Sequence, residues 1–203
     1  MRFRCSKAAG SFDCTKAGTF ELLIHIEADP NTESFAEFDF ATVLPPDKAR
    51  ELSNLQAFLL RHRAGIFVIS TYPAPDNCSP KFKAAWQDLD TILARRSIWL
   101  LAATTQDLRR EPQWSHALEI ARCAQADLDP SDQDRIIAHL SNVGSDTLHA
   151  CMKLCTSSAD SNDAVLRLVA NGTLYLDPPD ELTPSTALRL EPPAPPSSIT
   201  WAR

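Results

Sequence analysis

The sequence lacks a long apolar run, and no stretch approaches the roughly 20 apolar residues that a membrane-spanning helix needs. The N-terminus is basic (MRFRCSK), but no apolar segment follows it, so it does not read as a secretory signal. Phosphate-binding loops of the GxxxxGK[ST] or GxGxxG type are missing, and so is the GxSxG turn of serine hydrolases. These absences predict a cytoplasmic protein that has no membrane segment, no nucleotide-binding loop and no serine-hydrolase site.

CxxC pairs are also missing, although the chain has six cysteines. Scattered cysteines in a chain without an export signal are predicted to be free thiols. A zinc site built from His139, His149, Cys151 and Cys155 is the alternative, because Cys151 and Cys155 lie four residues apart on one helix face. Structural zinc sites usually include a CxxC knuckle, so we interpret these cysteines as small buried side chains.

Positive charge is scarce in the C-terminal part. The net charge is −6; residues 1–126 contain 15 basic and 15 acidic side chains, whereas residues 127–191 contain 4 basic and 11 acidic ones. A DNA-binding surface needs clustered positive charge to displace counterions from the phosphates. We therefore expect the C-terminal part to contact a basic protein surface instead of DNA.

The chain before residue 97 is predicted to alternate helices and strands after an irregular start over residues 1–18. Alternating apolar positions indicate a strand, and a continuous apolar, β-branched run indicates a strand buried on both faces. A strand, a helix and a second strand in succession predict two parallel neighbours covered by that helix. The predicted elements are helix Phe20–Glu27, strand Ser34–Leu44, helix Lys48–Arg61, strand Ile66–Thr71, helix Lys81–Arg95 and strand Trp99–Ala103.

The stretch Ser97–Arg122 is predicted to join two domains, because a helical unit ending in a hairpin follows it. Three helices and two strands in this order are the layout of a winged helix. We predict an α/β domain over residues 1–112, a connecting helix and linker over 113–130, a winged-helix-like α+β domain over 131–191 and a Pro-rich tail over 192–203. The predicted elements of the second domain are helices Ser131–Val143, Thr147–Cys155 and Ser161–Ala170 and strands Thr173–Leu176 and Thr186–Leu190.

Three segments of the chain resemble TnsA-like proteins, the endonuclease subunits of heteromeric bacterial transposition systems. They are FELLIHIEADP with SFAEF downstream, TTQDLRREP after the Trp99 strand, and AVLRLVANGTL near the end of the chain. The resemblance implies a restriction-endonuclease-like mixed sheet with flanking helices, followed by a winged helix. It also implies transposase or transposition regulator subunits as partners, DNA bound through the N-terminal half, and Mg²⁺ or Mn²⁺ as the cofactor of an active nuclease.

The metal-binding residues of that family are largely missing. Metal-dependent phosphodiester cleavage needs several hard oxygen ligands and a nearby Lys. The family supplies a helix Glu, a strand Asp, and a Glu or Gln two residues before a Lys; Glu21 matches the first, but Val68-Ile69-Ser70 stands at the last. We therefore predict a degenerate nuclease that retains Glu21 and needs no cofactor. An active endonuclease remains the alternative, with Glu21 joined by Asp47, by Asp39, or by loop residues Asp76, Lys81 and Lys83.

Two arginine pairs are candidates for contacting DNA or a partner: Arg95 with Arg96, and Arg109 with Arg110. The third helix of a winged helix usually reads the major groove through basic or amide side chains. Here that helix offers only Arg167, so we expect it to bind protein or to serve as scaffold. An unrelated two-domain interaction or regulatory protein is the remaining alternative.

Overall fold

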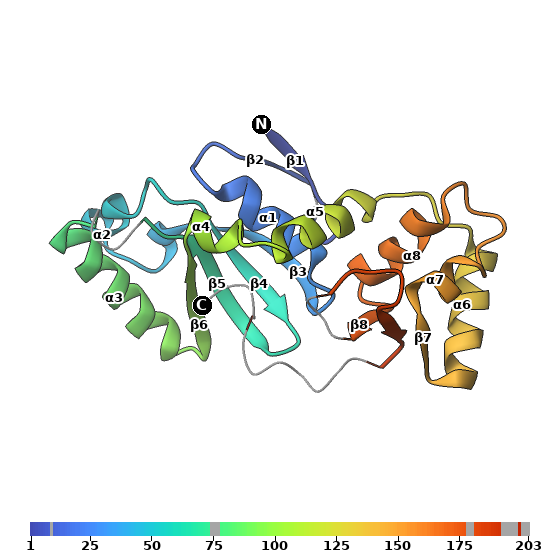
Figure 1. Cartoon of the computed structure of the whole chain (residues 1–203). Coiled ribbons are helices and arrows are strands. Elements are labelled where there is room, and N and C mark those ends of the chain that lie inside the picture. Colours follow the sequence, from blue (N-terminus) through green and yellow to red (C-terminus); the bar gives the residue numbers. More distant parts are fainter. Residues whose placement is uncertain (9, 74–77, 178–180, 192–198, 200–203) are drawn as a thin grey trace. The chain divides into compact units, whose positions relative to one another are not determined.

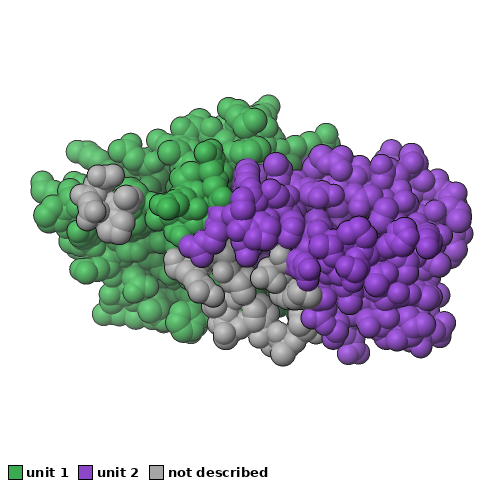
Figure 2. Space-filling model, viewed as in Figure 1, with its two compact units in different colours: residues 1–23, 32–109, 197–203 green, residues 24–31, 110–196 purple. Residues whose placement is uncertain are grey.

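The computed structural model describes residues 1–203 apart from residues 9, 74–77, 178–180, 192–198 and 200–203 (Figure 1). The predicted Pro-rich tail lies outside the described residues except for Ile199, which is buried. Two compact units make up the chain (Figure 2). Unit 1 contains residues 1–23, 32–109 and 197–203, and unit 2 contains residues 24–31 and 110–196. The division after Arg109 therefore falls inside the stretch Ser97–Arg122.

Unit 1 is built on a four-stranded mixed sheet in the order β3-β4-β5-β6. Strands β3 to β5 are antiparallel neighbours, and β6 runs parallel to β5 in a register that pairs Ile66 with Ile98 and Thr71 with Ala103. Helix α3 makes the crossover, so the predicted parallel pair is confirmed. The bounds are β3 Thr32–Phe38, β4 Ala57–His62, β5 Gly65–Thr71, α3 Pro80–Ala94 and β6 Ile98–Ala103.

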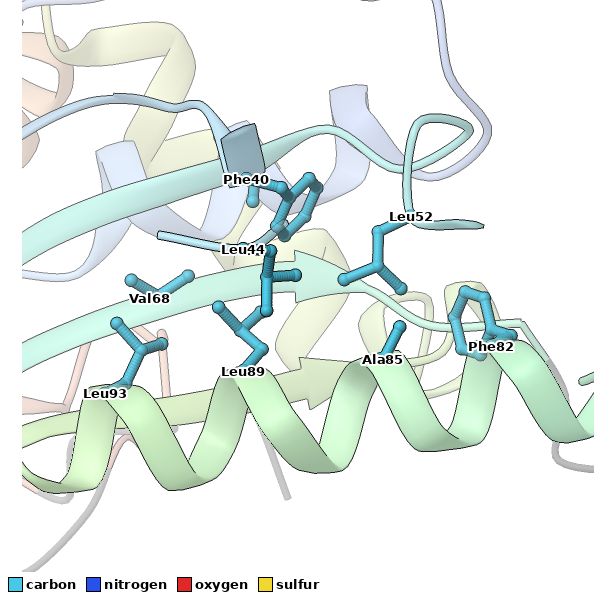
Figure 3. Close-up of a cluster of buried hydrophobic side chains, with 9 residues drawn as sticks. Phe40, Leu44, Leu52, Val68, Phe82, Ala85, Leu89 and Leu93 are labelled. Atoms are coloured by element: carbon cyan, nitrogen blue, oxygen red, sulfur yellow. The ribbon is translucent and has the colours of Figure 1, made fainter. Parts of the chain in front are cut away.

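Helix α3 covers one face of this sheet. The Ser79 hydroxyl caps it by accepting from the Phe82 N–H at 3.1 Å. Phe82, Ala85, Leu89 and Leu93 recur at helical spacing and form a buried stripe. Figure 3 shows Leu89 and Leu93 pointing toward Val68 of β5, and the cluster continues through Phe40, Leu44 and Leu52. Burying each of these leucines contributes about 1.5–3 kcal/mol, which fixes α3 on the sheet.

The first residues of the chain form a hairpin, so the prediction of an irregular start was wrong. Strands β1 (Arg2–Arg4) and β2 (Ser11–Asp13) pair antiparallel. The Phe12 ring lies 5.2 Å from the ring of Phe35 in β3 and 5.4 Å from the ring of Phe58 in β4. These contacts join residues far apart in the sequence, and local composition does not reveal them.

The predicted helix Lys48–Arg61 was also wrong. Helix α2 spans only Pro46–Glu51, and the following residues form strand β4. Strand β3 ends at Phe38, before the predicted limit, and a short 3-10 helix η1 (Phe40–Thr42) follows it. Ala57 and Phe58 point to opposite faces of the sheet and are both buried, so the start of β4 is covered on both faces and the run Ala57–Leu60 shows no alternation of polar and apolar residues.

Unit 2 combines helices with a three-stranded antiparallel sheet in the order β7-β9-β8. The predicted helices at Ser131–Val143 and Ser161–Ala170 are confirmed, and so is the final pair of strands. Strand β7 (Ser145–Thr147) was not predicted. It has only three residues, and the last of them, Thr147, is also the N-cap of α7. The bounds are α5 Gln113–Cys123, α6 Pro130–Val143, α7 Leu148–Met152, α8 Ser161–Ala170, β8 Tyr175–Asp177 and β9 Ala187–Arg189.

A membrane-spanning helix was not expected, and within the described part of the chain no helix has the length and apolar character to cross a bilayer.

Candidate functional site

One edge of the mixed sheet gathers the residues that matter for the nuclease resemblance. The first turn of helix α1 (Thr19–Ala28) approaches this edge, because the Thr71 hydroxyl at the end of β5 donates to the Ala17 carbonyl at 3.1 Å. The strand register brings four positions into one row at this edge: Phe38 of β3, Ala57 of β4, Ser70 of β5 and Ala102 of β6.

Glu21 lies in the first turn of α1, and its side chain is only 8% exposed. The guanidinium of Arg109 donates to Glu21 Oε1 through Nε at 2.9 Å and through a second nitrogen. Arg109 follows directly on helix α4 (Thr105–Leu108), whose start is fixed by a capping box between Thr104 and Asp107. The positive end of the α1 dipole and the guanidinium both stabilise the Glu21 carboxylate.

This arrangement makes Glu21 a structural ion-pair partner. A catalytic Mg²⁺ or Mn²⁺ would need further carboxylates beside it. The sheet edge supplies hydroxyl groups instead, and Ser70 already donates to the Gln56 carbonyl at 3.0 Å. No group of three or more His, Cys, Asp or Glu residues in the described part of the chain is arranged to hold a metal ion.

The structure brings together only two of the predicted site residues, Glu21 and Arg109. Asp47 lies exposed in the first turn of α2, and Arg95 and Arg96 lie exposed at the end of α3. Arg110 belongs to unit 2. Asp39 caps η1 by accepting from the Ala41 N–H at 2.9 Å, while Asp76 lies outside the described residues.

A second polar group at the same edge was not predicted. Gln56, immediately before β4, donates from Nε2 to Glu37 Oε1 of β3 at 2.9 Å. Among the described residues, Gln56 Oε1 is a buried atom without a hydrogen-bond partner. Both side chains line a cavity of about 620 Å³ in unit 1. Sequence reasoning missed the pair because it placed Gln56 inside a helix; the turn-forming Ser53-Asn54 before the apolar run Ala57–Leu60 was the signal that could have shown it.

Helix α8, which the resemblance implies as a DNA reader, has little exposed surface. Six of its ten residues, Ala164–Leu166 and Leu168–Ala170, are 0–1% exposed. Its polar residues hold neighbouring parts of unit 2, since Arg167 donates to the Ala126 carbonyl and Asp163 accepts from Arg122 at 2.8 Å. An α8 covered in this way has no free face for a DNA groove.

A buried carboxylate in α6 holds the connection between α7 and α8. Asp132 of α6 is 0% exposed and accepts from the backbone N–H groups of Thr156, Ser157 and Ser158 and from Arg135. Burial opposes its ionisation, but the hydrogen bonds from Ser158, Thr156 and Ser157 outweigh that effect and hold the pKa of Asp132 well below its usual value.

Three residues of the alternative zinc site, His139, Cys151 and Cys155, have other surroundings. His139 Nε2 lies 2.8 Å from Asp146 Oδ2, which holds the Asp146 pKa below its usual value. Burial raises the pKa of Cys151 to about 12 and that of Cys155 to about 11. Both thiols are therefore protonated at neutral pH, and all six cysteines are free, as predicted.

No protein-family model matches the chain, and no curated protein matches it either.

Proposed function

We propose that this protein is a TnsA-like component of a DNA transposition system that has lost its nuclease chemistry. The order of elements in unit 1 supports the proposal. A helix, three antiparallel strands, a crossover helix and a parallel fourth strand occur in the order α1, β3, β4, β5, α3 and β6, with the short helices η1 and α2 between β3 and β4. A restriction-endonuclease-like core has this order.

The order of elements in unit 2 supports a winged helix. The chain runs α6, β7, α7, α8, β8, β9, and the first strand pairs with the last in the sheet order β7-β9-β8. The segment between β8 and β9 would be the wing. Because α8 is covered, this winged helix would serve as scaffold and protein-binding module.

The loss of chemistry rests on the pairing of Glu21 with Arg109. In an active site of this kind the helix carboxylate helps to bind a divalent cation. Here the Arg109 guanidinium is hydrogen-bonded to the Glu21 carboxylate. Strand β5 offers neither a Lys nor a carboxylate at the matching position. An arginine beside the only retained ligand opposes metal binding electrostatically.

The charge of unit 2 supports a basic protein partner. Four of its cations are engaged within the unit: Arg122 with Asp163, Arg135 with Asp132, Arg189 with Asp177, and Arg167 with a backbone carbonyl. Unit 2 contains 15 acidic but only 6 basic side chains, so its carboxylates outnumber the cations of the unit. A transposase or regulator subunit with a basic surface fits this field.

Nicking of supercoiled plasmid in Mg²⁺ and in Mn²⁺ tests the loss of catalysis. We expect no metal-dependent nicking by the full chain, and no difference between the chain and its Glu21→Gln variant. Titration calorimetry with MnCl₂ should detect no binding to either protein. Metal-dependent nicking that Glu21→Gln abolishes would show an active endonuclease and overturn the proposal.

The transposition role has its own test. We expect the gene to lie beside genes for a transposase or its regulator, and the purified chain to co-elute with that protein in gel filtration. Co-elution should weaken above 0.5 M salt if the acidic surface of unit 2 makes the contact. Absence of such neighbouring genes would contradict the transposition role without restoring nuclease activity.

A further inference from the structure

The cavity at the edge of the mixed sheet has the size and lining of a small-molecule site. Its volume of about 620 Å³ lies within the range of roughly 300–1,000 Å³ that ligand pockets occupy. Two aromatic rings, Phe38 and Phe40, contribute to its wall and pack edge to face with centroids 5.8 Å apart. Leu55 adds further apolar surface. Phe40 is buried in the cluster under α3, so the half-buried Phe38 ring is the one that a flat ligand ring can contact.

The polar atoms in the wall near β3 and β4 are mainly acceptors. The Gln56 side chain is buried (8% exposed), and its Oε1 finds no hydrogen-bond donor among the described residues. A buried amide oxygen without a partner costs about 1–3 kcal/mol, so a ligand N–H that reached it would recover that free energy. The Glu37 carboxylate adjoins this oxygen through its bond to Gln56 Nε2 and adds a second acceptor.

Two cations line the same cavity. Lys16 precedes α1, and Arg50 lies in the last turn of α2. Within the described part of the chain neither side chain has an ion-pair partner, in contrast to Arg109 and Lys48. Asp39 also lines the cavity, but its carboxylate is used to cap η1. Unpaired cations beside an acceptor-lined apolar pocket suit a ligand that joins a donor-bearing ring to an anionic group.

We propose that this cavity binds a nucleotide whose base presents neighbouring N–H donors, with guanine preferred. The guanine ring would lie against Phe38, and its N1–H and N2 amino groups would donate to Glu37 and Gln56 Oε1. The phosphate would contact Lys16 and Arg50. The nucleotide is either free in solution or the terminal unit of a DNA strand, and the cavity can bind it whether or not the protein takes part in transposition.

Titration calorimetry of the full chain with deoxyguanosine monophosphate tests the proposal, with thymidine monophosphate as the comparison. Thymine presents a single N–H donor, so we expect it to bind at least tenfold more weakly. Arg50→Ala should weaken binding of deoxyguanosine monophosphate about tenfold through the lost phosphate contact. Lys83→Ala removes the same charge from an exposed position of α3 outside the cavity and should leave the affinity unchanged.

The Gln56→Leu variant tests base recognition. It should reduce the preference for guanine over thymine about tenfold while leaving the phosphate contacts in place. Circular dichroism establishes that the variant folds; Arg50→Ala carries the test if it does not. Equal affinities for both nucleotides, or no effect of Arg50→Ala, would overturn the proposal.

A single-stranded oligonucleotide ending in guanine separates the two sources of the ligand. Binding that is tighter than to the mononucleotide, and equally sensitive to Arg50→Ala, identifies a DNA end. Binding to the mononucleotide alone identifies a free nucleotide. Failure of both ligands to bind refutes the nucleotide site and leaves the loss of nuclease chemistry untouched.

Discussion

Asp132 shows how one residue can hold a loop in place. Its carboxylate has no exposed surface, yet it accepts from three successive backbone N–H groups at residues 156–158 as well as from Arg135. Those N–H groups lie in the connection between α7 and α8, where secondary structure does not satisfy them. A buried carboxylate without hydrogen-bond donors is costly, so these bonds fix the course of the connection around Asp132.

We expect Asp132→Asn to lower the Tm by about 5–10 °C, because the NH₂ group of the amide would face the backbone N–H donors of residues 156–158. The matched control is Asp134→Asn, which removes an exposed carboxylate two residues away on the same helix and should change the Tm by less than about 2 °C. Thermal unfolding followed by circular dichroism measures both. Equal effects of the two variants would contradict the role given to Asp132.

The same residue predicts a pH dependence. A folded-state pKa below the unfolded value of about 3.9 means that ionised Asp132 stabilises the fold at all pH values above about 4. That contribution is lost as the pH falls toward the folded-state pKa. The difference in Tm between the natural chain and Asp132→Asn should therefore shrink below pH 4.

At the scale of elements, the start of α1 depends on a close contact at Gly18. Its φ of +76° lies in the left-handed region, and an added Cβ would come within 2.7 Å of Thr71 Cγ2 and 2.8 Å of Thr105 Oγ1. This contact lets α1 approach the carboxyl ends of β5 and β6, where Glu21 reaches Arg109. The orientation of the Glu21 carboxylate therefore depends on a glycine.

Gly18→Ala should destabilise the fold by about 2–4 kcal/mol, about 1–2 kcal/mol from the left-handed backbone and the rest from the clash. Gly144→Ala is the control, because Gly144 has a φ of +81° and nothing within 4 Å of an added Cβ. Urea unfolding should show a clearly smaller loss for Gly144→Ala. If both substitutions cost the same, the contact between Gly18 and the threonines contributes nothing.

Sequence patterns predicted the elements whose buried residues follow a simple periodic or continuous apolar pattern. Helix α3 and helix α6 have one buried stripe each, and β5 is a continuous apolar run before a crossover helix, so their types followed from periodicity. Strand β4 was missed because the apolar residues Leu52, Leu55, Phe58 and Leu59, which run from the end of α2 into β4, also fit a helix spacing. That error hid the cavity, since Gln56 fell on the predicted helix Lys48–Arg61, whereas it lies immediately before β4.

The pairing of Glu21 with Arg109 could not be predicted either. The two residues are 88 positions apart, and only the packing of α1 against the end of β5 brings them together. Sequence comparison with a family pattern marked both residues separately, one as a metal ligand and the other as a surface contact.

At the scale of the whole molecule, the two units carry opposite net charge. Unit 1 contains 14 basic and 11 acidic side chains, whereas unit 2 contains 6 basic and 15 acidic ones. The unit division makes the contrast larger than the split at residue 126 indicated, because Glu27 and Asp29 join unit 2. A polyanion such as DNA should therefore contact unit 1, and unit 2 should be repelled by it.

Duplex DNA binding at 50 mM salt tests this division through two exposed cations that lack ion-pair partners among the described residues. Arg96 belongs to unit 1 and Lys153 to unit 2. We expect Arg96→Ala to weaken nonspecific binding about threefold and to reduce the slope of log K against log salt by about 1, since one phosphate contact is lost. Lys153→Ala should leave both quantities unchanged, because the net negative charge of unit 2 repels phosphates. Fluorescence anisotropy with a labelled duplex measures the two variants side by side, and a larger effect of Lys153→Ala would assign DNA binding to unit 2 and contradict the separation of roles.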